Sequence, residues 1–305
     1  MYFAVNPWPP GTYERLLAAL QNFREQGTAT GYTYVLLDAS FDQTLLTVSP
    51  WRRHVECTLY DDTRLVGLKA VAPHLLRLPA ELEKQAPWLK ELAEACSGKP
   101  MLSLLYSAIP AQALAAHFRT YLLARTEDSL EWPVRWGDTR VLPTLLATMT
   151  AAEREHFLAP IHGWLCVDRT GELIDWPGDG SQNPATVDFD CWLLDDARFS
   201  HLVEEAEADA VIGALHDTQP DLFDMQEPAA NYACVKKHLA IASQNGIEGV
   251  GARRHFAILA LMLSDDFTEH PAMHCVFKAI REGADYAAEV AVLPAEFWRQ
   301  TERKI

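Results

Sequence analysis

The spacing of apolar residues changes once along this 305-residue chain, and the change divides the chain into two parts. Up to about Trp176, short apolar runs of strand length alternate with segments whose apolar residues recur at helical spacing. Beyond Asp195 only the helical spacing remains, and the turn-rich segment PGDGSQNP at 177–184 lies in between. The sequence therefore predicts an α/β (α+β) N-terminal lobe with a mixed sheet and flanking helices, followed by an all-helical C-terminal lobe. The predicted bounds are 1–176 for the first lobe, 177–186 for a linker and 187–305 for the second lobe.

Individual elements of the N-terminal lobe follow from the residues that begin and end them. Thr12 and Gly27 are the residue types that begin and end a helix, which we predict over 13–26. Asp138 or Thr139 is expected to cap a later helix, and the Thr150 and Glu153 pair has the spacing of a capping box. We expect further helices over 81–96 and from 110, 141 and 150, and strands over 32–37, 71–78, 101–106, 134–136 and 162–167.

The C-terminal lobe is predicted to consist of helices over 196–215, 228–244, 253–263 and 271–282. The glycine-rich segment Gly246–Gly251 falls between two of them. A dinucleotide-binding loop would need a preceding strand, so we predict a turn between helices there.

Composition and charge limit the classes of function. With 49% apolar and 22% charged residues the chain should fold around a packed core. The formal net charge is −16, and 13 acidic residues against the single base Arg198 lie between Asp179 and Glu227. Nucleic-acid binding by neutralising phosphates needs the opposite sign. This acidic segment is either a solvated surface or one that steers a basic partner, and in the second case Glu204, Glu205 and Glu207 are candidate partner-binding residues.

Other patterns predict a soluble protein in a reducing compartment. The first ten residues contain neither a basic segment nor an apolar run of signal-peptide length, and about 18 uninterrupted apolar residues occur nowhere. The six cysteines stand at least 25 residues apart, which favours reduced thiols in the cytoplasm over disulfides or a CxxC metal site. The His270 and His274 pair has helical spacing, but Pro271 stands where a metalloprotease has its glutamate.

Motifs that carry catalysis or hold a cofactor are not found. No G-x-S-x-G nucleophile segment and no P-loop occur, so we predict no catalytic residues, no cofactor and no metal. Asp38, Arg135, Asp138 and Arg140 are charged residues at otherwise apolar strand ends, where ligands bind in open α/β folds. They are interpreted as caps and ion pairs, and the alternative is a polar site of a small-molecule hydrolase or transferase built on Asp38, Arg135 and Asp138.

Four short motifs in a fixed order suggest a family. They are YVLLDA at 34–39, LY at 59–60 leading to APHLLRL at 72–78, VRWGDTRVL at 134–142, and FLAPI at 157–161 with Trp164. In this order they resemble the adaptor domain of type VI secretion effector chaperones, over roughly Tyr32 to Val167. The helical remainder is similar to the more variable C-terminal lobe of that family. Its pattern commonly has proline after the aspartate of the third motif, where this chain has Thr139.

The resemblance implies a dedicated chaperone rather than an enzyme. Such proteins act in the cytoplasm of Gram-negative bacteria, bind the N-terminal region of one toxic effector and deliver it to the VgrG spike protein. The expected partners are therefore a cognate type VI effector and VgrG, with neither nucleic acid nor a membrane.

A binding function needs contact residues, and the sequence offers two further candidates. Trp51, Arg52 and Arg53 form a Trp-Arg-Arg cluster in a loop, and Trp and Arg are prominent in interface hot spots. The alternative for Trp51 is a loop anchor. Arg135 and Asp138, which belong to the third motif, are also candidate partner-binding residues.

Overall fold

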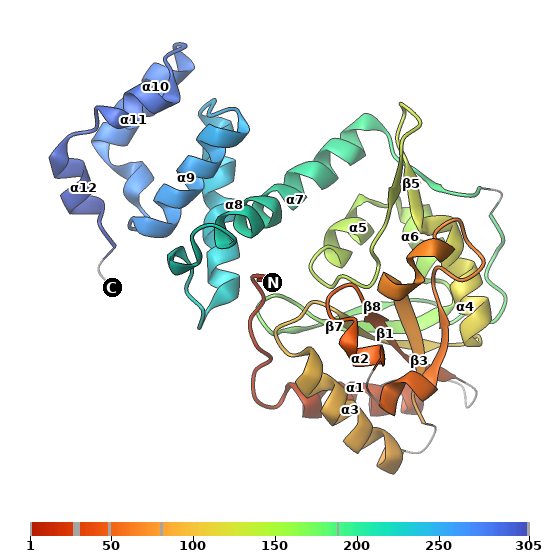
Figure 1. Ribbon diagram of the computed structural model, residues 1–305. Helices are drawn as coiled ribbons and strands as arrows, with labels where there is room; N and C mark the ends of the chain where they lie inside the picture. Colours follow the sequence, from red (N-terminus) through yellow and green to blue (C-terminus); the bar gives the residue numbers. More distant parts are fainter. Residues whose placement is uncertain (1, 27–30, 48–49, 80–81, 188, 304–305) are drawn as a thin grey trace. The chain divides into compact units, whose positions relative to one another are not determined.

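The computed structural model describes residues 2–26, 31–47, 50–79, 82–187 and 189–303. They form two compact units, shown in Figure 1: a sheet unit, Val5–Glu205, and a helical unit made of Met1–Ala4 and Ala206–Ile305. The division falls within α7 (Asp196–His216), later than the linker predicted over 177–186. The reason is β9 (Trp192–Leu193), which pairs with β5 (Leu123–Arg125) and holds the chain beyond 186 in the sheet unit.

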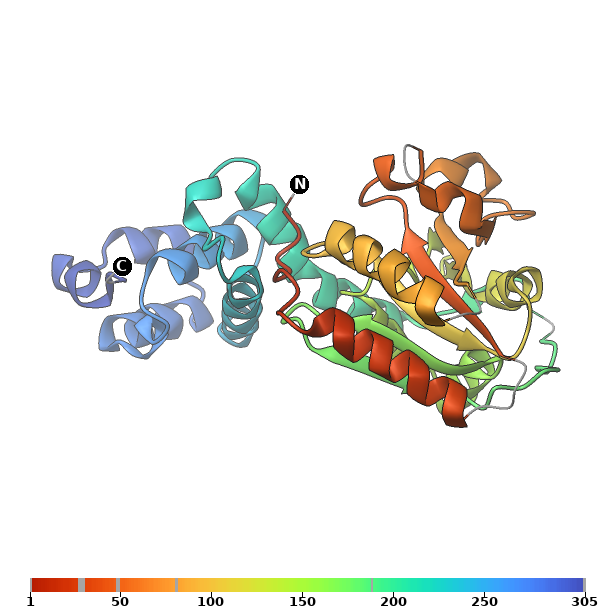
Figure 2. The same cartoon turned by 90° about the horizontal axis from the view of Figure 1, so that it is seen from below.

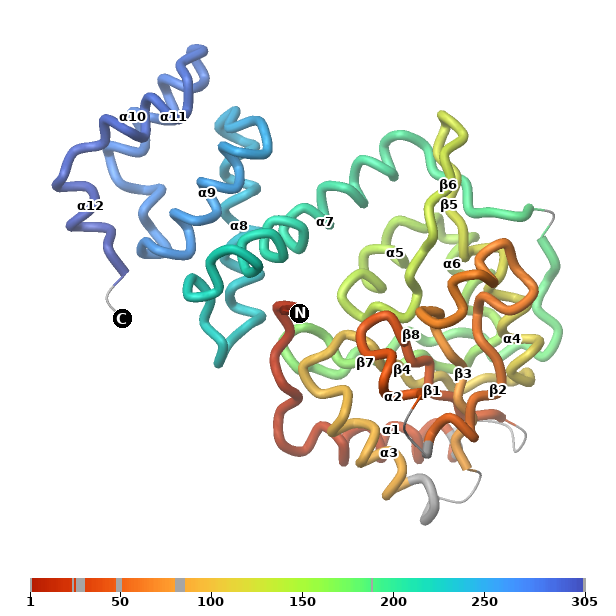
Figure 3. The backbone as a smooth tube through the Cα atoms, in the orientation of Figure 1, coloured from red at the N-terminus to blue at the C-terminus, as the bar shows by residue number. Residues whose placement is uncertain are grey.

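The sheet unit contains a six-stranded sheet in the order β2-β3-β1-β4-β7-β8, whose neighbouring strands are all antiparallel. A smaller sheet has the order β6-β5-β9, where β5 runs antiparallel to β6 and parallel to β9. Figure 3 shows β5 and β6 as a hairpin. The predicted fold class is confirmed, and its mixed pairing lies in this smaller sheet. The other strands are β1 (Tyr32–Asp38), β2 (Val55–Thr58), β3 (Pro73–Arg77), β4 (Leu102–Ser107), β6 (Glu131–Pro133), β7 (Ile161–Val167) and β8 (Leu173–Pro177).

Helices cover both faces of the large sheet because its central strand is apolar on both sides. In β1, Val35 and Leu37 pack with α1 (Thr12–Gln26) and α3 (Leu82–Cys96), which lie side by side in Figure 2. Tyr34 and Leu36 pack on the opposite face with α4 (Ala111–Phe118) and α6 (Ala151–Leu158). Burial of each large apolar side chain contributes about 1.5–3 kcal/mol, so this central strand fixes the layer order.

The segment after β6 departs from the sequence prediction. No strand forms over 134–136, where Trp136 is fully buried and its Nε1 donates to the carbonyl of Tyr121 at 2.8 Å. Neither Asp138 nor Thr139 caps the next helix, α5 (Leu142–Thr148), whose N-cap is Val141 without a side-chain hydrogen bond. The side chain of Asp138 binds Arg140 instead. The predicted capping box of Thr150 and Glu153 is confirmed at the start of α6.

The helical unit continues α7 with α8 (Pro228–Gln244), α9 (Val250–Met262) and α10 (Pro271–Arg281), close to the predicted ranges. Two short helices, α11 (Tyr286–Ala291) and α12 (Ala295–Thr301), were not predicted. The glycine-rich segment forms the predicted turn between α8 and α9, with positive φ at Gly246 and Gly249. In the described part of the chain, no helix combines the length and apolarity needed to cross a membrane.

The ring of His117 in α4 is held neutral inside the sheet unit. Its Nε2 donates to the carbonyls of His156 at 3.0 Å and Phe157 at 3.2 Å. Burial, followed by repulsion from the neighbouring His156 ring, lowers the pKa of His117 to about 4. An unfolded histidine has a pKa near 6.5, so between these values the unfolded chain binds more protons than the folded one.

We therefore expect the sheet unit to lose up to about 3 kcal/mol of stability as the pH falls from about 6.5 to 4. Urea denaturation followed by tryptophan fluorescence at several pH values measures this loss. His117→Gln keeps a donor but cannot titrate in this range, so its stability should depend less steeply on pH. Equal slopes for the two proteins would contradict the assignment to His117.

Candidate functional site

The four charged residues predicted at strand ends come together at one end of β1. Asp38 is the last residue of β1, and Arg135, Asp138 and Arg140 lie on the turn between β6 and α5. Gly137 permits this approach, because a Cβ at that position would lie 2.8 Å from the Cβ of Asp38. Any larger residue would push the turn away from the strand.

Arginines surround both carboxylates. Arg135 Nη2 lies 3.0 Å from Asp38 Oδ2, and Arg135 Nη1 lies 3.8 Å from Asp138 Oδ2. Arg140 binds Asp138 through two bonds, Nε to Oδ1 at 3.0 Å and Nη2 to Oδ2 at 2.9 Å. Ser40 donates to Asp38 Oδ1 from its backbone nitrogen at 3.0 Å and from its hydroxyl at 2.6 Å.

Exposure separates the members of this network. The side chains of Asp38 and Asp138 are 1% and 3% exposed, whereas that of Arg135 is 39% exposed. The Arg135 guanidinium lies over the ring of Phe41, 4.5 Å from its centroid. These ion pairs hold the turn on the strand. They also fix Arg135 so that one edge of its guanidinium lies at the surface.

The Trp-Arg-Arg cluster is divided between core and surface. The cluster lies on a short 3-10 helix, Pro50–His54, and not in the predicted loop; Trp51 is 6% exposed and anchors this helix in the apolar cluster under α1 and α3. Arg52 and Arg53 are exposed. Arg52 also borders a cavity of about 550 Å³, lined among others by Cys57, Asp61 and His74. The surface candidates of this cluster are therefore the two arginines.

The three acidic candidates all lie on α7 but differ in their partners. Glu204 is exposed and Glu205 is partly buried. Glu207 binds Arg253 of α9 through both carboxylate oxygens. Its charge therefore holds α7 against α9, which leaves Glu204 as the most accessible of the three.

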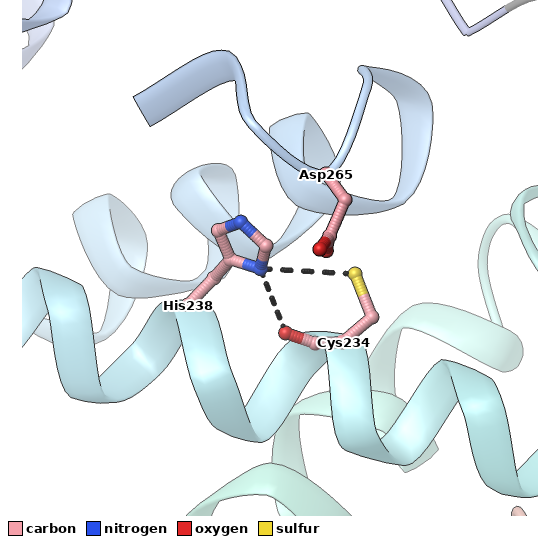
Figure 4. A group of neighbouring side chains, drawn as sticks. All are labelled: Cys234, His238 and Asp265. Carbon is pink, nitrogen blue, oxygen red and sulfur yellow. Dashed lines mark hydrogen bonds between the residues drawn. The ribbon is translucent and has the colours of Figure 1, made fainter. Parts of the chain in front are cut away.

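One group of possible metal ligands was missed by the sequence analysis. Cys234 and His238 lie one turn apart on α8, and Asp265 follows α9; their ligand atoms all lie within 4.8 Å of one another (Figure 4). Cysteine and histidine at i and i+4 on a predicted helix could have indicated two of them. Asp265 could not be found, because only the folded helix pair brings it close.

The histidine pair considered from the sequence has another role. His270 is the N-cap of α10, and its Nδ1 accepts a hydrogen bond from the backbone nitrogen of Ala272 at 3.1 Å. Its Nε2 lies 3.0 Å from Gln300 Oε1. Both ring nitrogens are thus engaged, and this histidine begins a helix.

Comparison with known proteins gives one match, to a family model that covers part of the chain. Residues 33–156 match the model of a family described as a domain of unknown function, DUF4123. The matched segment begins in β1 and ends in α6, so it contains the whole Asp38 and Arg135 network. It also lies inside the range, Tyr32 to Val167, over which the motifs predicted a resemblance. No match was found among curated proteins or among solved structures.

The ion-pair network predicts a large effect of Arg140→Ala on stability. Asp138 would stay buried with only the more distant Arg135, at 3.8 Å, as its partner, and since removing one member of a buried pair costs about 3–5 kcal/mol, the loss should approach this range. Urea denaturation should show this loss in the sheet unit. Arg52→Ala, at an exposed position, is the matched control and should change stability by less than about 0.5 kcal/mol. Similar midpoints for the two variants would show that the network contributes little.

Proposed function

We propose that this protein is a cytoplasmic adaptor of a type VI secretion system, which binds one effector and assists its loading onto the VgrG spike. The observation that carries the proposal is the match of residues 33–156 to DUF4123, a family associated with type VI effector adaptors. The first three motifs of the resemblance lie in that segment, and the fourth, FLAPI at 157–161 with Trp164, follows directly after it.

The structure of the matched segment supports a binding function. Its strands and helices contribute to a packed apolar core, and its turn after β6 is fixed by buried ion pairs. A fixed arginine edge at Arg135 and two exposed arginines at Arg52 and Arg53 are suited to acidic or carbonyl-rich surfaces of a partner. Arginine is over-represented in such contacts because its guanidinium is planar and keeps its charge.

The state of the cysteines supports a cytoplasmic location. All six are free of disulfides, and Cys96 and Cys166 are buried in the core of the sheet unit. Burial raises the pKa of Cys96 to about 12, which keeps that thiol protonated and unreactive. Such inert buried thiols are common in proteins of reducing compartments.

Deleting the gene for this protein should lower the stability and the secretion of one effector while the secretion apparatus still fires. Affinity purification of the tagged protein from the wild-type strain should recover the same effector, and genes for an effector and a spike protein should lie beside its own. Unchanged effector level and secretion in the deletion strain would refute the proposal.

Complementation with surface variants tests which residues take part. Arg52→Glu with Arg53→Glu should reduce effector recovery, because both side chains are exposed and the change reverses two charges. Arg154→Glu, also exposed in the sheet unit, is the matched control. Equal recovery from both would exclude the Arg52 and Arg53 surface as the contact.

A further inference from the structure

Side chains from two packed helices converge in the helical unit. The Cys234 Sγ lies 3.7 Å from His238 Nδ1, and a carboxylate oxygen of Asp265 lies within 4.8 Å of both atoms. Figure 4 shows the thiol, the ring nitrogen and the carboxylate pointing toward a common space. A thiol, an imidazole and a carboxylate are three of the ligand types that zinc prefers.

We propose that Cys234, His238 and Asp265 bind one zinc ion, with a water molecule as the fourth ligand. Zinc lies about 2.3 Å from sulfur and about 2.0–2.1 Å from nitrogen in tetrahedral sites, which places these two ligands roughly 3.5 Å apart. The observed separation of 3.7 Å between Cys234 Sγ and His238 Nδ1 is close to this expected distance. A soft thiolate with an imidazole favours zinc over magnesium or calcium, whose ligands are oxygen atoms.

Packing holds the ring of His238 in place before any metal binds, whereas the hydrogen bonds of His238 Nδ1 and the Cys234 thiol are exchanged for the metal. His238 is fully buried, and its ring stacks on Phe267 with centroids 5.2 Å apart. Its Nδ1 donates to the carbonyl of Cys234 at 2.8 Å, and the Cys234 thiol donates to the carbonyl of Ala260 at 3.2 Å. Metal binding replaces both hydrogen bonds: the thiol releases its proton to solvent, and the ring carries its proton on Nε2.

The third ligand is the adjustable one. Asp265 is exposed and lies in the loop between α9 and α10, so a small movement brings its carboxylate to the metal. Lys237 Nζ binds Asp265 Oδ2 at 2.7 Å. The ammonium can keep one carboxylate oxygen while the other binds zinc, which is the outer contact that commonly orients a ligating carboxylate.

The site joins α8 to the loop after α9, so zinc should act as a structural clamp of the helical unit. The residues lie outside the segment that matches DUF4123, and this proposal does not depend on the proposed function. A ligand that binds only the folded state raises stability in proportion to the logarithm of its concentration over Kd.

Cobalt titration of chelator-treated full-length protein tests the site. One equivalent of Co²⁺ should produce a thiolate-to-metal charge-transfer band together with the visible bands of tetrahedral cobalt, and Zn²⁺ should remove both. Zn²⁺ should also raise the temperature at which the helical unit unfolds. Absence of the charge-transfer band in the unaltered protein would overturn the proposal.

Variants identify the ligands. Cys234→Ser should abolish the charge-transfer band, whereas Cys275→Ser, at an exposed cysteine on α10, should keep it. Asp265→Asn changes an exposed side chain and should fold normally. It should weaken the binding of Co²⁺ by at least about 10-fold, because the loss of an outer contact alone weakens metal binding by about 10-fold to 100-fold and Asp265 is a direct ligand. A charge-transfer band that survives Cys234→Ser or is lost with Cys275→Ser would contradict the assigned ligands. An unchanged affinity of Asp265→Asn for Co²⁺ would also contradict them.

Discussion

The two-sided burial of β1 is the constraint on which the sheet unit depends. Five successive residues of this strand, from Tyr34 to Asp38, are almost completely buried, with Tyr34 and Leu36 on one face and Val35 and Leu37 on the other. A strand that is apolar on both faces can only lie inside a layer, so helices must cover both sides of the sheet. The amphipathic helices α1, α3 and α4 supply that cover.

The same burial creates an electrostatic requirement where the strand ends. Asp38 is the last residue of β1 and is still 1% exposed, so its carboxylate needs donors inside the protein. Ser40 provides two of them, and Arg135 reaches it from a turn 97 residues later in the chain. On that turn Trp136 points into the core while Arg135 reaches the surface. One short segment therefore anchors the turn and presents the arginine.

Sequence periodicity predicted the elements whose signal is local. The helices at 13–26 and 228–244, the strands around β1, β4 and β7, and the capping box at Thr150 all follow from nearby residues. The predicted strand over 134–136 was wrong because Trp136 is buried on a turn, where its Nε1 donates to the carbonyl of Tyr121. Asp138 was expected to cap a helix, but its side chain is taken by Arg140 two residues later.

Contacts between distant segments explain what the sequence could not show. The two-residue strand β9 has no periodicity of its own; it pairs with β5 at Trp192, which is buried, and lies in the sheet unit. The charged residues Asp38, Arg135, Asp138 and Arg140 were grouped from the sequence as strand ends, but only Asp38 ends a strand, and the other three reach it from the turn between β6 and α5. Cys234, His238 and Asp265 could not be grouped from the sequence, since no rule of spacing joins a helix to a loop more than 25 residues later.

The features that suggest partner binding and those that suggest metal binding lie in different units. The match to DUF4123 lies entirely within the sheet unit, which also holds the fixed arginine edge. The helical unit carries the cysteine, histidine and aspartate group, and its core is a separate set of buried residues around Phe256 and Phe267. A metal in the helical unit would stabilise that core without altering the arginines of the sheet unit. Loss of zinc and loss of the partner surface would therefore have distinguishable consequences: the first lowers the stability of one unit, and the second leaves both units folded.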